Sequence, residues 1–227
     1  MNKREKSALP TWEQLERSRT LYLEYEPRDL FYRTATELVA LALDGKTHLS
    51  VAETLAVLLQ TWNAPYYRFH PFDAERFSAL ETVLSSQRSA LDGFRSRTIA
   101  TMTTGESQIV AYLFAAFEFV LGPVGAAKAL HLLAPEFFPL WDRQIAKAYR
   151  INLHAPGTNA TDFVRFMTIV VKQVAQLVYD GPCVDLLKRM DEYNYCRFTK
   201  RWSWSARKVS QGATADTWFY GVPEPTM

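Results

Sequence analysis

The chain has 227 residues, of which 48% are hydrophobic and 14% aromatic, so it can bury one sizeable core. Its net charge of +2 neither requires nor excludes a polyanionic partner. The charged N-terminus precedes no apolar stretch, and no apolar run is long enough to span a membrane, so we expect a cytoplasmic protein without a signal peptide. Cys183 and Cys196 lack the spacing and the nearby histidines that zinc needs, so we expect no metal and no other cofactor.

Apolar residues recur at helical intervals and no alternating run predicts a strand, so the chain is expected to be all-α. The first predicted helix runs from about Asp29 to Asp44 and stops at Gly45. Ser50 and Glu53 form a capping box that predicts the start of the next helix. Prolines and rings between Thr61 and Asp73 predict an aromatic loop.

Asp73 is expected to cap a helix that runs toward Leu91 and stops at Gly93. The strongly apolar stretch from Glu106 to Leu121 predicts a helix through the core that ends at Gly122. Further helices are expected over about 98–102, 126–133, 142–151 and 161–179, with a last one from Pro182 toward Trp204. No linker divides the chain, so we predict a single helical domain over residues 1–227.

The most informative segment lies between Leu121 and Asp142. Gly122 and Gly125 are separated by Pro-Val and lie between two predicted helices, which allows a tight turn with unusual backbone angles. Amides at the start of the second helix can bind a phosphate there. An ordinary helix–helix connection would also use glycine, and the turn alone does not decide between the two interpretations.

This segment resembles the signature of the helix-hairpin-helix DNA glycosylases. In those enzymes a Gly-hydrophobic-Gly hairpin grips a DNA phosphate, an alanine packs in the second helix, and an aspartate shortly after a proline starts the next helix. Gly122 to Gly125 match the hairpin, Ala129 the alanine, and Pro139 to Asp142 the catalytic corner. The resemblance implies a helical glycosylase-like bundle, which can have two lobes with the active site between them, and it locates the hairpin and catalytic corner in residues 106–151.

More narrowly, Lys128 to Asp142 is similar to a bacterial and archaeal branch described as oxoguanine-glycosylase-like. One kind of member removes glucosylated hydroxymethylcytosine from phage DNA and leaves an abasic site. The resemblance therefore implies a monomeric antiviral enzyme that acts on double-stranded DNA containing a modified base, with an oxidised purine as the second expected substrate. Gln144 occupies a place where the family often has histidine, and Ala127 one where lyases carry lysine. We therefore expect a monofunctional enzyme.

Asp142 is the expected catalytic residue, because breaking an N-glycosidic bond creates positive charge on the sugar that a carboxylate stabilises. Aspartate is also among the best helix N-caps, and the two roles are compatible. Lys128 is a second catalytic candidate, as an amine nucleophile. A phosphate contact or a solvated surface charge is the favoured role for it. His131 lies in an apolar run and is expected to pack rather than react.

A glycosylase must also flip the base into a pocket with aromatic walls. The residues expected to form that pocket are Trp62, Asn63, Tyr66, Tyr67 and Trp141, for which core packing is the alternative. The residues expected to contact the DNA backbone are Gly122, Val124, Gly125, Ala126, Arg143, Lys147, Lys200 and Arg201. The last two belong to a predicted basic and aromatic helix over about 183–209, together with Arg197, Arg207 and Lys208. Two other classes stay open: a non-catalytic DNA-binding domain and a protein-interaction module.

Overall fold

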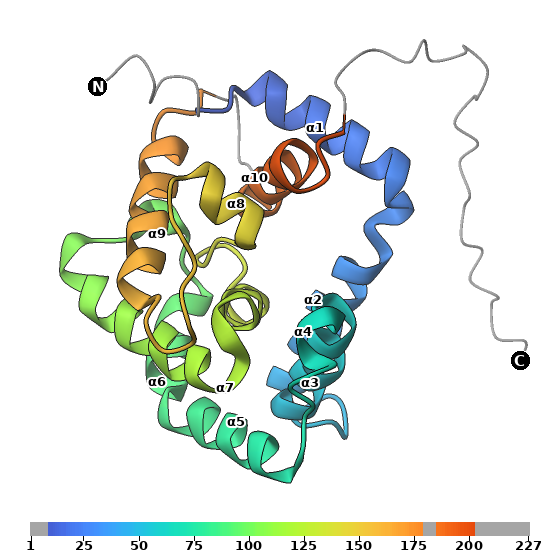
Figure 1. Cartoon of the computed structure of the whole chain (residues 1–227), viewed down its shortest axis with the longest axis vertical. Helices are drawn as coiled ribbons and strands as arrows, with labels where there is room; N and C mark the ends of the chain where they lie inside the picture. Colours follow the sequence, from blue (N-terminus) through green and yellow to red (C-terminus); the bar gives the residue numbers. More distant parts are fainter. Residues whose placement is uncertain (1–8, 179–184, 203–227) are drawn as a thin grey trace, which may run out of the picture.

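The computed structural model describes residues 9–178 and 185–202, and these are mostly helical with no strand, which confirms the all-α prediction (Figure 1). The α-helices are α1 (Trp12–Tyr25), α2 (Leu30–Leu43), α3 (Val51–Trp62), α4 (Ala64–Tyr67), α5 (Ala74–Ser86), α6 (Arg88–Arg95), α7 (Ser107–Leu133), α8 (Arg143–Ala148), α9 (Ala160–Val174) and α10 (Leu186–Asn194). Short 3-10 turns η2 (Pro27–Asp29), η3 (Ile99–Thr101) and η4 (Thr104–Glu106) join them, and a π-helical turn, η5 (Tyr195–Thr199), follows α10.

The centre of the fold is α7, which packs against α9, α5, α2, α3 and α6. Its side chains are buried on several faces, as predicted for the stretch from Glu106 to Leu121. By length and composition Thr104–Leu133 could also cross a membrane, but more than half of its most apolar stretch is buried inside the protein. Its apolar character therefore has an explanation in the packing of the core.

The remaining helices flank α7 on opposite sides (Figure 1). In this view α2, α3 and α4 are grouped to the right of α7, while α9 lies to its left and α8 above it. Helix α1 packs along α10, and this pair makes the most extensive contact between two helices in the described chain. The second half of α7 faces both groups, so residues just after its break can meet side chains from either side.

Several helix starts follow the predicted capping pattern. Ser50 forms a capping box with Glu53, and the Asp73 side chain accepts a hydrogen bond from the amide of Arg76 at 2.9 Å. The same signal begins α1, where Thr11 and Gln14 cap each other reciprocally. Sequence analysis did not predict α1 because its apolar stripe is weak, and its burial depends on packing against α10.

Helix ends differ more from the predictions. The helix that begins after Asp73 breaks at Gln87, and Gly93 lies inside α6 instead of ending a helix. The aromatic loop contains the short helix α4. The helix predicted over 142–151 ends earlier, before Arg150 with its positive φ of 60°, and the helix predicted to reach Tyr179 ends at Val174.

The predicted C-terminal helix is described only in part. It is α-helical to Asn194 and continues as the π-helical turn to Thr199. Pro182, Cys183, Trp204, Arg207 and Lys208, which sequence analysis singled out, lie outside the described residues.

Candidate functional site

The break in α7 lies at Gly122, where φ is 72° and ψ is 168°. This region of backbone angles is open essentially only to glycine, so the turn explains that residue. Two hydrogen bonds hold the turn from outside. Trp141 Nε1 donates to the carbonyl of Pro123 at 3.0 Å, and Tyr67 Oη donates to the carbonyl of Leu121 at 3.0 Å. The predicted tight turn between two helical segments is therefore present.

Both glycines of the turn lie against tyrosines of α4. A Cβ placed on Gly122 would lie 2.6 Å from Tyr66 Oη, and one placed on Gly125 would collide with Tyr67 Oη. The turn and α4 therefore pack closely enough to exclude even a methyl group. Of the predicted DNA-backbone contacts in this turn, Gly122, Gly125 and Ala126 are buried and Val124 is partly exposed.

A cleft of about 640 Å³ opens beside the turn, within the size range of ligand pockets. One wall comes from the end of α3 and from α4, and the other from the second half of α7 and the start of α8. Predicted site residues that line it are Trp62, Asn63, Tyr66, Gly122, Val124, Lys128, Asp142 and Arg143. The fold thus brings together the predicted catalytic residues and three members of the predicted base pocket.

Asp142 caps α8 and also lines the cleft. Its Oδ1 accepts hydrogen bonds from the amides of Gln144 and Ile145, both at 2.7 Å, and its Oδ2 accepts one from Thr199 Oγ1 at 2.7 Å. The carboxylate is half-buried. These three bonds orient it firmly, so the capping role and a role in the cleft are compatible in geometry.

Lys128 is not a solvated surface charge. Its Nζ donates to the carbonyl of Trp62 at 2.8 Å and lies 4.7 Å from the centre of the Trp62 ring. Burial lowers the pKa of Lys128 to about 8, although attraction to Asp191 and Asp142 opposes the shift. A lysine with a lowered pKa has more free amine at neutral pH, so the structure supports a nucleophilic role more than the sequence did.

Trp141 belongs to the core and not to the cleft. Its side chain is 1% exposed and packs edge-on against Phe114 and Phe163. Tyr67 is also buried, and its hydroxyl serves the turn. Sequence analysis placed both residues in the base pocket, because aromatic rings near a catalytic residue are common both in pocket walls and in the core. In the structure α9 packs against α7, and this packing buries both rings in the core.

The predicted basic track is only partly assembled. Arg143 lines the cleft, while Lys147 and Lys200 are exposed outside its lining. Arg201 lines a separate cavity beside Trp202, and the Trp202 ring stacks on Tyr25 of α1 with 4.1 Å between the ring centres. This ring is therefore occupied by α1 and is not a free stacking surface.

Sequence analysis missed the loop that closes the far end of the cleft, which contributes Leu153, His154 and Pro156. Glu118 of α7 anchors this loop although its side chain is fully buried. It accepts a hydrogen bond from the amide of Asn159 at 3.2 Å, and Asn159 Oδ1 accepts one from the amide of His154 at 2.6 Å. A glutamate within the most apolar stretch of the chain was the signal that could have found this anchor.

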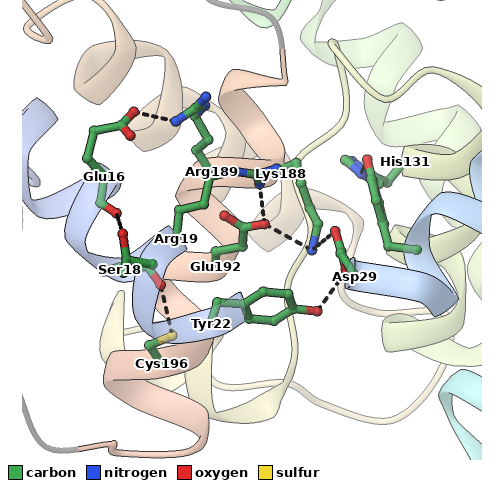
Figure 2. Close-up of polar contacts among 12 residues, drawn as sticks. Glu16, Ser18, Arg19, Tyr22, Asp29, His131, Lys188, Arg189, Glu192 and Cys196 are labelled. Atoms are coloured by element: carbon green, nitrogen blue, oxygen red, sulfur yellow. Dashed lines mark hydrogen bonds and ion pairs between the residues drawn. The ribbon is translucent and has the colours of Figure 1, made fainter. Parts of the chain in front are cut away.

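A buried ionic network lies behind the cleft, between α1 and α10. Figure 2 shows the Lys188 ammonium between Asp29 at 3.2 Å and Glu192 at 3.5 Å. Arg19 approaches Glu192 at 2.7 Å, and Tyr22 Oη donates to Asp29 at 3.1 Å. These opposite charges offset part of the cost of burial, while Glu192 Oε2 is buried without a hydrogen-bond partner among the described residues.

His131 has the packing role predicted for it. It is fully buried, its Nε2 lies 2.7 Å from Tyr32 Oη, and its Nδ1 lies 2.8 Å from the carbonyl oxygen of Phe138. Burial lowers its pKa to about 4, so the ring is neutral at physiological pH.

In comparisons with known proteins, no family model, no curated protein and no solved structure matches the chain. Among the residues that the structure describes, no group of three or more His, Cys, Asp or Glu side chains is placed to hold a metal ion. The cleft itself offers one oriented carboxylate, one amine with a lowered pKa, and aromatic residues beside a glycine turn.

Proposed function

We propose that this protein is a DNA glycosylase of the helix-hairpin-helix type that cleaves the N-glycosidic bond of a modified base in double-stranded DNA. The observation that carries the proposal is the meeting of Asp142, Lys128 and the Gly122 turn in one cleft. A duplex whose phosphate is bound at the turn would bring a flipped nucleotide into that cleft. No cofactor is needed for this reaction.

Asp142 would stabilise the positive charge that develops on the sugar as the bond breaks. Its two backbone hydrogen bonds at the start of α8 hold the carboxylate in place before the substrate arrives, so little reorganisation is needed during the reaction. Trp62 and Tyr66 line the cleft, and a flipped base would stack on the face of each ring that Lys128 and His70 leave open, with the Asn63 amide at its edge.

The first substrate that we propose is glucosylated hydroxymethylcytosine in phage DNA, which the narrower sequence resemblance implies. The volume of the cleft, about 640 Å³, supports a base with a bulky substituent. Removal of that base would leave an abasic site and damage the phage genome. We therefore propose a role in antiviral defence for a monomeric cytoplasmic enzyme.

A second candidate activity is favoured by one observation on Lys128. Because burial lowers the pKa of this amine to about 8, it can attack the sugar carbon and form a Schiff base, as in an oxidised-purine glycosylase with lyase activity. Borohydride reduction would trap a covalent protein–DNA adduct in that case and none for a monofunctional enzyme. Lys128→Gln is the variant that should abolish the adduct.

The test of the proposed function is base release from unmodified, oxidised and glucosylated duplex DNA, followed by mass spectrometry of the freed base. Asp142→Asn should abolish release while DNA binding remains. Asp73→Asn is the matched control, because Asp73 caps α5 in the same way and does not line the cleft. DNA binding without release by the wild type would favour the non-catalytic alternative, and no DNA binding would favour a protein-interaction module.

A further inference from the structure

A second cavity adjoins the cleft, and we call it the inner cavity. It has a volume of about 280 Å³ and lies between α1, α2, the end of α3 and α10. Trp62 and Tyr195 line both spaces, so these two residues lie at the border between them. A flipped base held between the two rings would have its sugar on the side of Asp142 and its far edge toward the inner cavity.

The inner cavity contains the half-buried carboxyl group of Asp191. Asp191 lines the cavity from α10, and within the described residues it makes no hydrogen bond or ion pair. Its neighbour Lys188 is already held by Asp29 and Glu192, and its ammonium lies over the Tyr22 ring at 4.3 Å. A half-buried carboxyl without a partner is costly, so a functional reason for it is worth seeking.

The surroundings of Asp191 keep part of its population protonated at neutral pH. Burial is the main cause that raises its pKa to about 7, and Asp142 and Glu192 add to the shift. Lys188 and Lys128 oppose it. The other titratable groups that face the inner cavity are Glu26, Tyr22, Tyr32 and Tyr195. Asp142, in contrast, is held at the N-terminus of α8 by two backbone amides.

We propose that Asp191 is the acid that protonates the departing base while Asp142 stabilises the sugar. This inference rests on the proposed glycosylase function and adds a second catalytic carboxyl to it. Glycoside cleavage uses two carboxyl groups on either side of the scissile bond, one as acid and one as stabiliser.

The reaction balances with one water molecule. The C1′–N bond breaks, and its electron pair passes to the base. A ring nitrogen or carbonyl oxygen of the base takes the proton of the Asp191 carboxyl. Water adds to C1′ and releases a proton to solvent, which leaves the abasic sugar, and Asp191 regains a proton from solvent. The products are a neutral free base and an abasic site.

The test uses single-turnover base release by the full chain from a duplex that the wild type cleaves. Asp191→Asn should lower the rate by roughly 10²-fold, as loss of a general acid does. It should also remove the fall in rate that the wild type shows as pH rises through about 7. The defect should shrink for bases that carry an electron-withdrawing substituent, because a better leaving group needs less help from an acid.

Glu26→Gln is the control, since Glu26 is another carboxylate of the inner cavity and should keep both the rate and the pH profile. Asp191→Ser serves as a second variant should Asp191→Asn fail to fold. A wild type that releases no base overturns the proposed function itself. An active wild type whose Asp191 variants keep its pH profile, or lose rate equally for good and poor leaving groups, overturns only the assignment of Asp191 as the acid.

Discussion

The contact between Gly125 and Tyr67 allows a sharp test of how the turn is built. A Cβ on residue 125 would collide with Tyr67 Oη, whereas the next ring atom, Cζ, would be 3.5 Å away. The Leu121 Cβ would lie at 3.1 Å. Gly125 does not have a positive φ, so alanine is not strained in the backbone there. Most of the conflict in Gly125→Ala therefore comes from the Tyr67 oxygen, with a smaller part from Leu121.

The expected magnitudes follow from that geometry. Overpacking by a methyl group costs about 1–3 kcal/mol, and displacing Tyr67 from the carbonyl of Leu121 costs about 1 kcal/mol more. The better helix propensity of alanine returns about 1 kcal/mol. Gly125→Ala should therefore reduce the free energy of unfolding by about 1–3 kcal/mol. Tyr67→Phe alone should reduce it by about 1–2 kcal/mol, because the carbonyl of Leu121 loses its donor.

The double variant should be more stable than the two single losses suggest. Phenylalanine at position 67 lacks the colliding oxygen, and the hydrogen bond is lost only once, so the better helix propensity of alanine at position 125 is recovered. We expect a favourable coupling of about 2–4 kcal/mol in the double-mutant cycle, measured by urea unfolding. Losses that add to within about 0.5 kcal/mol would refute this account of the turn. Gly93→Ala is the control, because no atom lies within 4 Å of its added Cβ. Its free energy of unfolding should rise by about 0.5–1 kcal/mol.

Three further predictions follow from the same structure. Gly122→Ala should lower the free energy of unfolding by at least about 1–3 kcal/mol through backbone strain alone. Adding Tyr66→Phe should not restore that stability in urea unfolding, because Tyr66 Cζ would also lie only 2.7 Å from the new Cβ. Lys188→Ala should lower the free energy of unfolding by about 3–5 kcal/mol, because Asp29 and Glu192 would stay buried without their cation, and an unchanged urea midpoint would refute this. The melting temperature of Asp191→Asn should rise relative to that of the wild type as pH increases from about 4 to 7, because the folded wild type holds the Asp191 proton more tightly than the unfolded chain does. A difference in melting temperature that stays constant across this range, measured by thermal unfolding, would contradict the raised pKa.

Local signals explain which parts of the fold were predictable. Ser50, Asp73 and Asp142 were expected to begin helices, and each side chain accepts a hydrogen bond from an amide two or three residues further on. Capping depends on neighbours within one turn, so a short window of sequence contains the needed information. The ends of α5 and α9 were misplaced because no comparable signal marks them.

The residues of the candidate site also differ in how well sequence alone predicted them. Asp142 and Lys128 were singled out from a segment of sequence, and the cleft contains both. Trp141, one residue before Asp142, was placed in the pocket and lies in the core, because its side chain points toward α7 and α9. Adjacent residues point in different directions at a helix start, and only the packed neighbours reveal which side is open.

The sequence by itself determined that this chain is helical, that its most apolar helix crosses the core, and that a sharp turn follows Leu121. Each depends on periodicity or on the backbone preference of glycine, which act over a few residues. Three contacts were decided only by the tertiary structure. Lys128 contacts Trp62, Asp191 lies near Asp142, and Tyr67 packs against Gly125. Those pairs come from helices far apart in the chain, and the burial that alters their charge exists only after the helices have packed together.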